Sequence, residues 1–105
     1  MRIYISGKIT GDENYEKKFA EKEQELKNIF PKCKIINPVK ISKKVQRLIK
    51  NPSMADYMKA DIKKLMKCNV VYMLDDYSDS RGAKAELEIA KVLSIKIVYE
   101  INKKI

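Results

Sequence analysis

The feature that most constrains the fold is an uninterrupted apolar run, Val70 to Leu74. A strand without polar positions must be covered on both faces, which is typical of a central strand in a parallel sheet. Three further segments have the composition of strands: Arg2–Ser6, Lys34–Ile36 and Ile95–Tyr99. The chain therefore needs helices on both faces of its sheet.

Segments with helical spacing of apolar residues separate these strands. They are Asn14–Phe30, Ser42–Ile49, Met54–Lys67 with Ser53 as its N-cap, and Gly82–Leu93. This order predicts an α/β fold, a three-layer sandwich with a mainly parallel sheet of four to five strands, Rossmann- or flavodoxin-like. A length of 105 residues suits one domain, residues 1–105.

Several classes of function are excluded or disfavoured by composition. The chain has no His, which excludes Ser-His-Asp triads and imidazole acid–base chemistry. Its two cysteines, Cys33 and Cys68, are predicted to be core thiols, and we expect neither a metal nor a cofactor. The sequence predicts no membrane span and no signal peptide, so the expected location is the cytoplasm.

The formal charge of +9 favours anionic ligands. Of the 23 basic residues only three are Arg, and they form no cluster of the kind that reads nucleic acid. The charge therefore favours anionic ligands in general, and we do not expect a nucleic acid as partner.

All three glycines lie where predicted strands end. Gly7 and Gly11 follow the first strand, and Gly82 follows the polar loop Asp75–Arg81. In open parallel sheets, ligands bind beyond the carboxyl ends of the strands, and glycine permits close approach of the backbone. The alternative interpretation is that these glycines serve tight turns alone.

Two carboxylates lie on apolar helix faces. Glu86 shares its face with Gly82, Ala83, Ile89 and Ala90, near a helix N-terminus that favours an ionised carboxylate, and is a candidate nucleophile. Its alternative role is to cap a backbone amide or to pair with a lysine. Asp61 adjoins the stripe of Met54, Met58, Ile62 and Leu65; its alternative role is a surface charge at the edge of that stripe.

Three segments, in this order, resemble the nucleoside 2-deoxyribosyltransferase superfamily, which includes 2'-deoxynucleoside 5'-phosphate N-hydrolases and small phage or bacterial proteins. The first is Tyr4-Ile5-Ser6-Gly7-Lys8-Ile9-Thr10-Gly11. The second is Ala60-Asp61-Ile62 through Leu65, continued by Asn69-Val70-Val71. The third is Ser80-Arg81-Gly82-Ala83-Lys84-Ala85-Glu86-Leu87 with Ala90.

The resemblance implies roles for these residues. Glu86 would attack C1' of a 2'-deoxyribose, Asp61 would hold or protonate the leaving base, and Tyr4 would orient Glu86 and the sugar. Water as acceptor gives hydrolysis, and a second base gives transfer. Where the transferases commonly carry Asp, this chain has Ser80, which favours 5'-monophosphates. The implied substrate-binding residues are Ser6, Gly7, Lys8, Thr10, Gly11, Ser80 and Gly82.

The sequence also departs from the family pattern. Glu88 stands where Gly is frequent, Asn69 replaces a common Asp, and the segment after the last strand offers only Asn102 to close a partner's pocket. These departures bear on base and sugar specificity. The family further implies a homodimer or a larger symmetric oligomer. Two alternatives remain: a non-catalytic nucleotide-binding or regulatory module on the same fold and, more distantly, a basic nucleic-acid-binding protein.

Overall fold

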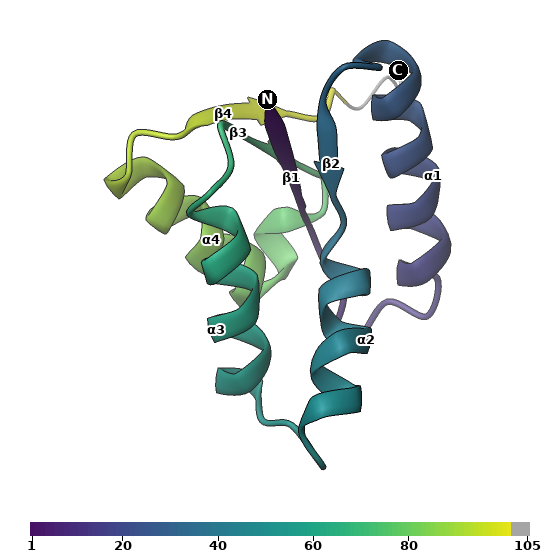
Figure 1. Cartoon of the computed structure of the whole chain (residues 1–105), viewed down its shortest axis with the longest axis vertical. Coiled ribbons are helices and arrows are strands. Elements are labelled where there is room, and N and C mark those ends of the chain that lie inside the picture. The colour runs from purple at the N-terminus through teal and green to yellow at the C-terminus, as the bar shows by residue number, and fades with distance from the viewer. Residues whose placement is uncertain (102–105) are drawn as a thin grey trace.

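The computed structural model describes residues 1–101, so Asn102 lies outside the described residues. All four strands are parallel and form one sheet in the order β2-β1-β3-β4 (Figure 1). Their bounds are β1 Arg2–Ser6, β2 Lys34–Ile36, β3 Val70–Met73 and β4 Lys96–Tyr99. The predicted α/β fold with a parallel sheet is confirmed. Strand β2 lies on one side of β1, and β3 followed by β4 lies on the other. The strand order therefore reverses between β1 and β3, and the carboxyl ends of these two strands form a topological switch point.

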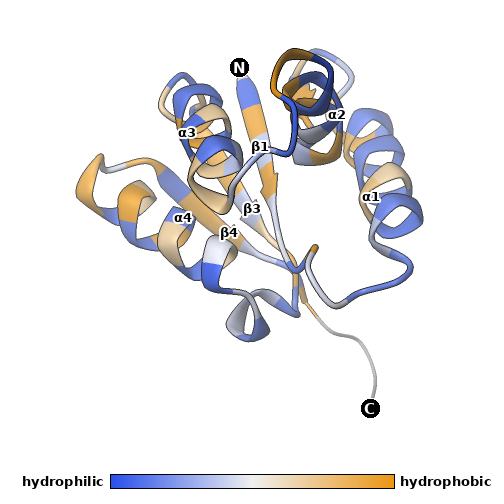
Figure 2. Ribbon diagram, turned by 90° about the horizontal axis from the view of Figure 1, so that it is seen from below, coloured by the Kyte–Doolittle hydropathy of each residue, from blue (hydrophilic) through white to orange (hydrophobic). Residues whose placement is uncertain are grey.

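The helices form two outer layers. Seen from below the view of Figure 1, α1 lies on one side of the sheet and α3 and α4 on the other (Figure 2). The helical segments are α1 Tyr15–Ile29, α2 Pro38–Leu48, α3 Met54–Leu65, the short 3₁₀ helix η1 Tyr77–Asp79 and α4 Arg81–Val92. No helix in residues 1–101 is long and apolar enough to cross a membrane.

The central strand β3 contributes to the core on both of its faces. Val70 and, just beyond the strand, Leu74 pack in the cluster on the α1 side, whereas Val71 and Met73 pack in the cluster under α3 and α4. Each such fully buried side chain stabilises the fold by roughly 1.5–3 kcal/mol. The apolar run that predicted a doubly covered strand therefore has that position in the structure.

Helix α2 begins four residues earlier than the sequence pattern predicted. Asn37 is its N-cap, with Oδ1 accepting a hydrogen bond of 2.9 Å from the amide of Val39, and Pro38 occupies the first turn. The Asn-Pro pair thus ends β2 and starts a helix at once, because Pro suits a position whose amide has no helical partner. The predicted cap at Ser53 is confirmed and forms a reciprocal capping box with Asp56.

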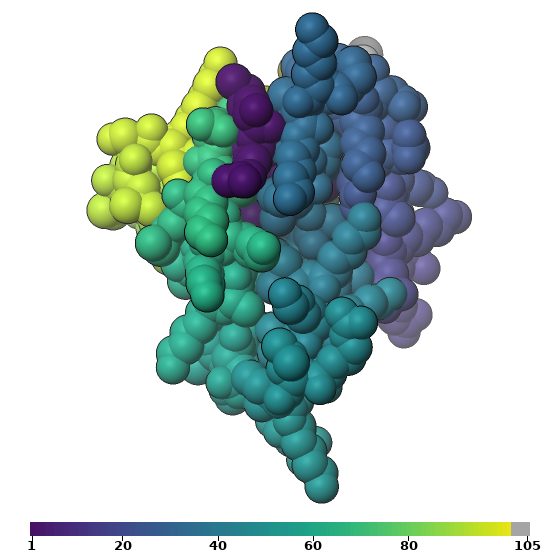
Figure 3. All heavy atoms as spheres, viewed as in Figure 1, coloured from purple at the N-terminus to yellow at the C-terminus, as the bar shows by residue number. Residues whose placement is uncertain are grey.

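The α2–α3 hairpin extends past the carboxyl edge of the sheet. Helix α2 continues in the direction of the strands and α3 returns beside it, so the hairpin forms a tip in the space-filling view (Figures 1 and 3). Asn51, between the two helices, has a φ of 50°. Met54, predicted on the apolar face, is 58% exposed because it lies on this projecting end.

A buried carboxylate joins α1 to the junction of β2 and α2. Glu23 is 6% exposed and accepts hydrogen bonds from Asn37 Nδ2 (3.0 Å), Lys40 Nζ (2.8 Å) and Lys27 Nζ (2.7 Å). Burial alone would raise the pKa of Glu23, but these donors outweigh it and lower the pKa to about 2. The charge-assisted contacts therefore stabilise the position of the α2 cap.

We predict that Glu23→Gln lowers the free energy of unfolding at pH 7 by about 1–2 kcal/mol, because it removes two charge-assisted hydrogen bonds. The native pKa lies below the ordinary value of 4.5, so the stabilisation is present above pH 4.5 and is lost as the pH falls toward 2. Urea unfolding at several pH values measures this. Glu21→Gln on the exposed side of α1 is the control; an equal loss in both variants, or a loss that persists at the lowest pH, would contradict the prediction.

Candidate active site

Both oxygens of the Glu86 carboxylate accept hydrogen bonds from hydroxyl groups of β1. Tyr4 Oη lies 2.6 Å from Oε2, and Ser6 Oγ lies 2.7 Å from Oε1. Tyr4 and Ser6 point to the same sheet face because they are two residues apart on a strand, and α4 lies over that face. Glu86 is 5% exposed, which confirms its predicted place on the apolar face of its helix. The two donors fix the rotamer of the carboxylate.

Burial and hydrogen bonding act on Glu86 in opposite directions. Burial raises the pKa of Glu86, and the hydrogen bonds from Tyr4 and Ser6 lower it, with a result of about 7. Burial and the charges of Glu86 and Asp61 raise the pKa of Tyr4 well above its ordinary range, so its hydroxyl remains a donor at neutral pH. Glu86 is therefore available as an ionised carboxylate near neutrality.

Asp61 supplies a second carboxyl group of different character. It lies on α3, is 7% exposed, and its Oδ1 has no hydrogen-bond partner within residues 1–101. Burial, together with the charge of Glu86, raises the pKa of Asp61 to about 8. Asp61 thus holds a proton at a pH where Glu86 can be ionised. Two carboxyl groups whose environments separate their protonation states are suited to acid and nucleophile roles.

The predicted glycines allow close packing around this site. A Cβ on Gly7 would lie 2.6 Å from Leu74 Cδ1, so no larger residue fits without movement. A Cβ on Gly82 would lie 3.4 Å from Met58 Sδ, which places the start of α4 against α3. Gly11 lies in an exposed turn with a φ of 85°. Glycine is favoured there because it adopts this backbone conformation without strain, and not because a side chain would lack space.

The predicted polar residues have different surroundings. Ser80 is the N-cap of α4: its Oγ accepts a hydrogen bond from the Ala83 amide (3.1 Å), which leaves its hydroxyl proton free to donate. Thr10 is exposed in the loop after β1. Ser6, predicted to contact substrate, donates a hydrogen bond to Glu86. The sequence does not predict this hydrogen bond, because Glu86 lies 80 residues further along the chain.

A lysine that the sequence did not single out joins the two loops of the site. Lys18 Nζ, on α1, bonds to the carboxylates of Asp12 and Asp76 (2.5 Å each) and to the carbonyl of Lys8 (2.8 Å). Asp76 also accepts from the amide of Lys8 (3.0 Å). The loop after β1 is thereby attached to the loop after β3. In the described part of the chain, His, Cys, Asp and Glu form no group of three that could hold a metal ion.

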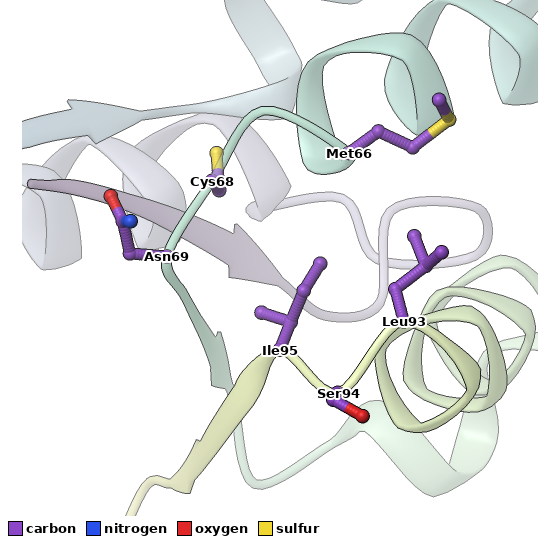
Figure 4. A pocket seen from close by; sticks show the side chains of 6 residues that line it. All are labelled: Met66, Cys68, Asn69, Leu93, Ser94 and Ile95. Atoms are coloured by element: carbon purple, nitrogen blue, oxygen red, sulfur yellow. The ribbon is translucent and has the colours of Figure 1, made fainter.

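A cavity of about 410 Å³ lies at the opposite, amino-terminal edge of the sheet. The α3–β3 and α4–β4 connections line it, through Met66, Cys68, Asn69, Leu93, Ser94 and Ile95 (Figure 4). Both cysteines are free: Cys68 is buried and Cys33 is partly buried against the α1-side core. None of the predicted site residues lines this cavity.

Comparison with known proteins gives the family. Residues 1–99 match the family described as a domain of unknown function, DUF4406. The chain belongs to this family. No curated protein matches it. Among solved structures, the DUF4406 chain is similar to a 2-deoxyribosyltransferase from the psychrotolerant bacterium Bacillus psychrosaccharolyticus, with a TM-score of 0.71 and 18% identity over 98% of this chain and 77% of the other. The two proteins share a fold.

The buried carboxyl of Asp61, whose Oδ1 has no hydrogen-bond partner in residues 1–101, predicts a pH-dependent cost to this DUF4406 fold. Its native pKa exceeds the ordinary value of 3.8, so the wild type loses stability as the pH rises from about 4 to about 8. Asp61→Asn does not titrate. Its melting temperature should therefore exceed that of the wild type by an amount that grows with pH, to at least about 4 °C at pH 9.

Thermal unfolding of both proteins at pH 5, 7 and 9 measures this difference. Asp79→Asn, an exposed change of the same chemistry, should show no such trend. A gap between Asp61→Asn and the wild type that stays constant or narrows with rising pH would contradict the burial-driven shift.

Proposed function

We propose that this chain cleaves the N-glycosidic bond of 2'-deoxynucleosides or their 5'-monophosphates, with Glu86 as nucleophile. The observation that carries the proposal is the Glu86 carboxylate, buried and held on both oxygens by Tyr4 and Ser6. The protonated Asp61 beside it and the fold shared with a 2-deoxyribosyltransferase support the same conclusion. An ordinary structural glutamate would pair with a lysine, as Glu23 does.

In the first step, a Glu86 oxygen attacks C1' of the sugar. The bond from C1' to the base nitrogen breaks, and its electron pair leaves with the base. Asp61 donates its proton to the departing base and becomes a carboxylate. The products of this step are the free base and a glycosyl ester on Glu86, as in retaining glycoside cleavage.

In the second step, an acceptor attacks C1' and releases Glu86. Asp61, now ionised, takes a proton from the acceptor, which restores the starting protonation of both carboxyl groups. Water as acceptor gives hydrolysis to the free sugar, and the nitrogen of a second base gives transfer. Tyr4 keeps its proton throughout and holds Glu86 in one orientation.

The loops after β1 and before α4 supply candidate contacts for the 5' end of the substrate. Ser80 retains a hydroxyl proton that can be donated to a phosphate oxygen. Gly82 begins the same helix, whose N-terminus favours an anion. Lys8, Thr10 and Gly11 follow β1 in the loop attached by Lys18, and Gly7 permits its close packing. These features support a 5'-monophosphate over an uncharged nucleoside.

We also propose that the chain acts as a homodimer. Three large apolar side chains are exposed on the α2–α3 hairpin: those of Leu48, Ile49 and Met54. This hairpin extends past the carboxyl edge of the sheet, where the candidate site also lies. Exposed apolar groups that lie together are typical of contact surfaces between proteins.

The proposal predicts release of free base from 2'-deoxynucleosides or their 5'-monophosphates, measured by chromatography with and without a second base. Glu86→Gln should lower the rate by about three orders of magnitude or more, since it removes the nucleophile. The control is Glu21→Gln, an exposed change of the same chemistry on α1, which should retain wild-type activity.

Two results would contradict the proposal. Equal rates in the wild type and Glu86→Gln would remove Glu86 from the chemistry. Saturable nucleotide binding without base release by the wild type, even after long incubation, would instead identify a non-catalytic binding module on this fold.

A further inference from the structure

The net positive charge of the chain arises from one half of the fold. Residues 31–69, which comprise β2, α2, α3 and their connections, hold eleven of the 23 basic residues but only two of the 14 acidic ones. This segment therefore carries the entire formal excess of +9, and the remainder of the chain is balanced. The acidic residues there are the capping Asp56 and the buried Asp61, so almost all exposed charges of this half are positive.

Three cations of this half, together with Arg2 of β1, surround one small hollow. It has a volume of about 90 Å³ and is lined by Arg2, Lys34, Ile36, Lys64 and Lys67. Arg2 and Lys34 are directly opposite each other on β1 and β2, and alternation puts them on the same sheet face as Tyr4. Lys64 lies in the last turn of α3 and Lys67 just after it. Strand and helix cations thus converge from two sides.

The four cations repel one another, and a bound anion would relieve this repulsion. Within residues 1–101, none of the four side chains takes part in an ion pair. The C-terminal end of α3 favours nearby lysines, but it does not explain the pair on the strands. The positive potential also reaches Cys68, whose pKa is raised by burial but lowered by Arg2 and Lys64.

We propose that this hollow binds a phosphate group, as free phosphate or as the end of a phosphomonoester. The Arg2 guanidinium can donate to two phosphate oxygens, and the three ammonium groups can each donate to one. Ile36 provides an apolar wall on one side. The hollow is near the amino-terminal edge of the sheet, whereas Glu86 faces the carboxyl edge, so this site is separate from the proposed catalytic one and does not rest on it.

Titration of ¹⁵N-labelled protein with inorganic phosphate, and separately with glycerol 3-phosphate, tests the proposal by NMR at constant ionic strength. Saturable shifts are expected at the amides of residues 2, 34, 64 and 67. Lys34→Gln/Lys67→Gln should weaken this binding at least tenfold. The matched control, Lys44→Gln/Lys50→Gln, removes two charges from the same cationic half outside the hollow and should change it less than twofold.

Several results of this titration would overturn the proposal. Equal weakening by both double variants, or tighter binding of a single-stranded oligonucleotide that both variants weaken alike, would indicate a diffuse cationic surface and overturn the proposal. Shifts confined to residues 7–11 and 80–83 would locate phosphate at the opposite edge and also overturn it. Wild-type shifts at the hollow remain decisive even if the double variant fails to fold.

Discussion

The structure is organised around two hydroxyl–carboxylate hydrogen bonds between β1 and α4. Tyr4 and Ser6 can reach both oxygens of Glu86 only if β1 is central, if α4 crosses its face, and if the strand alternation is kept. The doubly covered strand β3 meets the first two requirements by fixing β1 beside it and by leading into α4. Loss of register by one residue would turn both hydroxyls to the opposite face.

The environment gives two chemically identical groups different protonation states. Glu86 has two hydroxyl donors that favour its charge, whereas Asp61 Oδ1 has no partner in the described part of the chain and lies near that charge. A buried carboxyl without a partner is costly to ionise, and a fold selected for stability alone would exclude it. We interpret this cost as the basis of an acid–nucleophile pair.

Local patterns predicted much of the fold and part of the site, whereas long-range contacts did not follow from them. The apolar run Val70–Leu74 indicated a covered strand, and helical periodicity placed Glu86 on a buried face. The bond between Ser6 and Glu86 and the Lys18 attachment of two loops join residues far apart in the chain, and no local pattern signals such pairs. The predicted start of α2 is four residues too late because an Asn-Pro pair can end a strand and can also cap a helix, and Asn37-Pro38 does both.

The proposed mechanism requires a covalent bond between Glu86 and the sugar. Rapid acid quenching of the protein during incubation with a 2'-deoxynucleoside 5'-monophosphate, followed by peptide mass spectrometry, detects such a bond. The proposed mechanism predicts a sugar phosphate adduct on the peptide that contains Glu86, absent from Glu86→Gln. An adduct on another residue, or undiminished base release by Glu86→Gln, would contradict it.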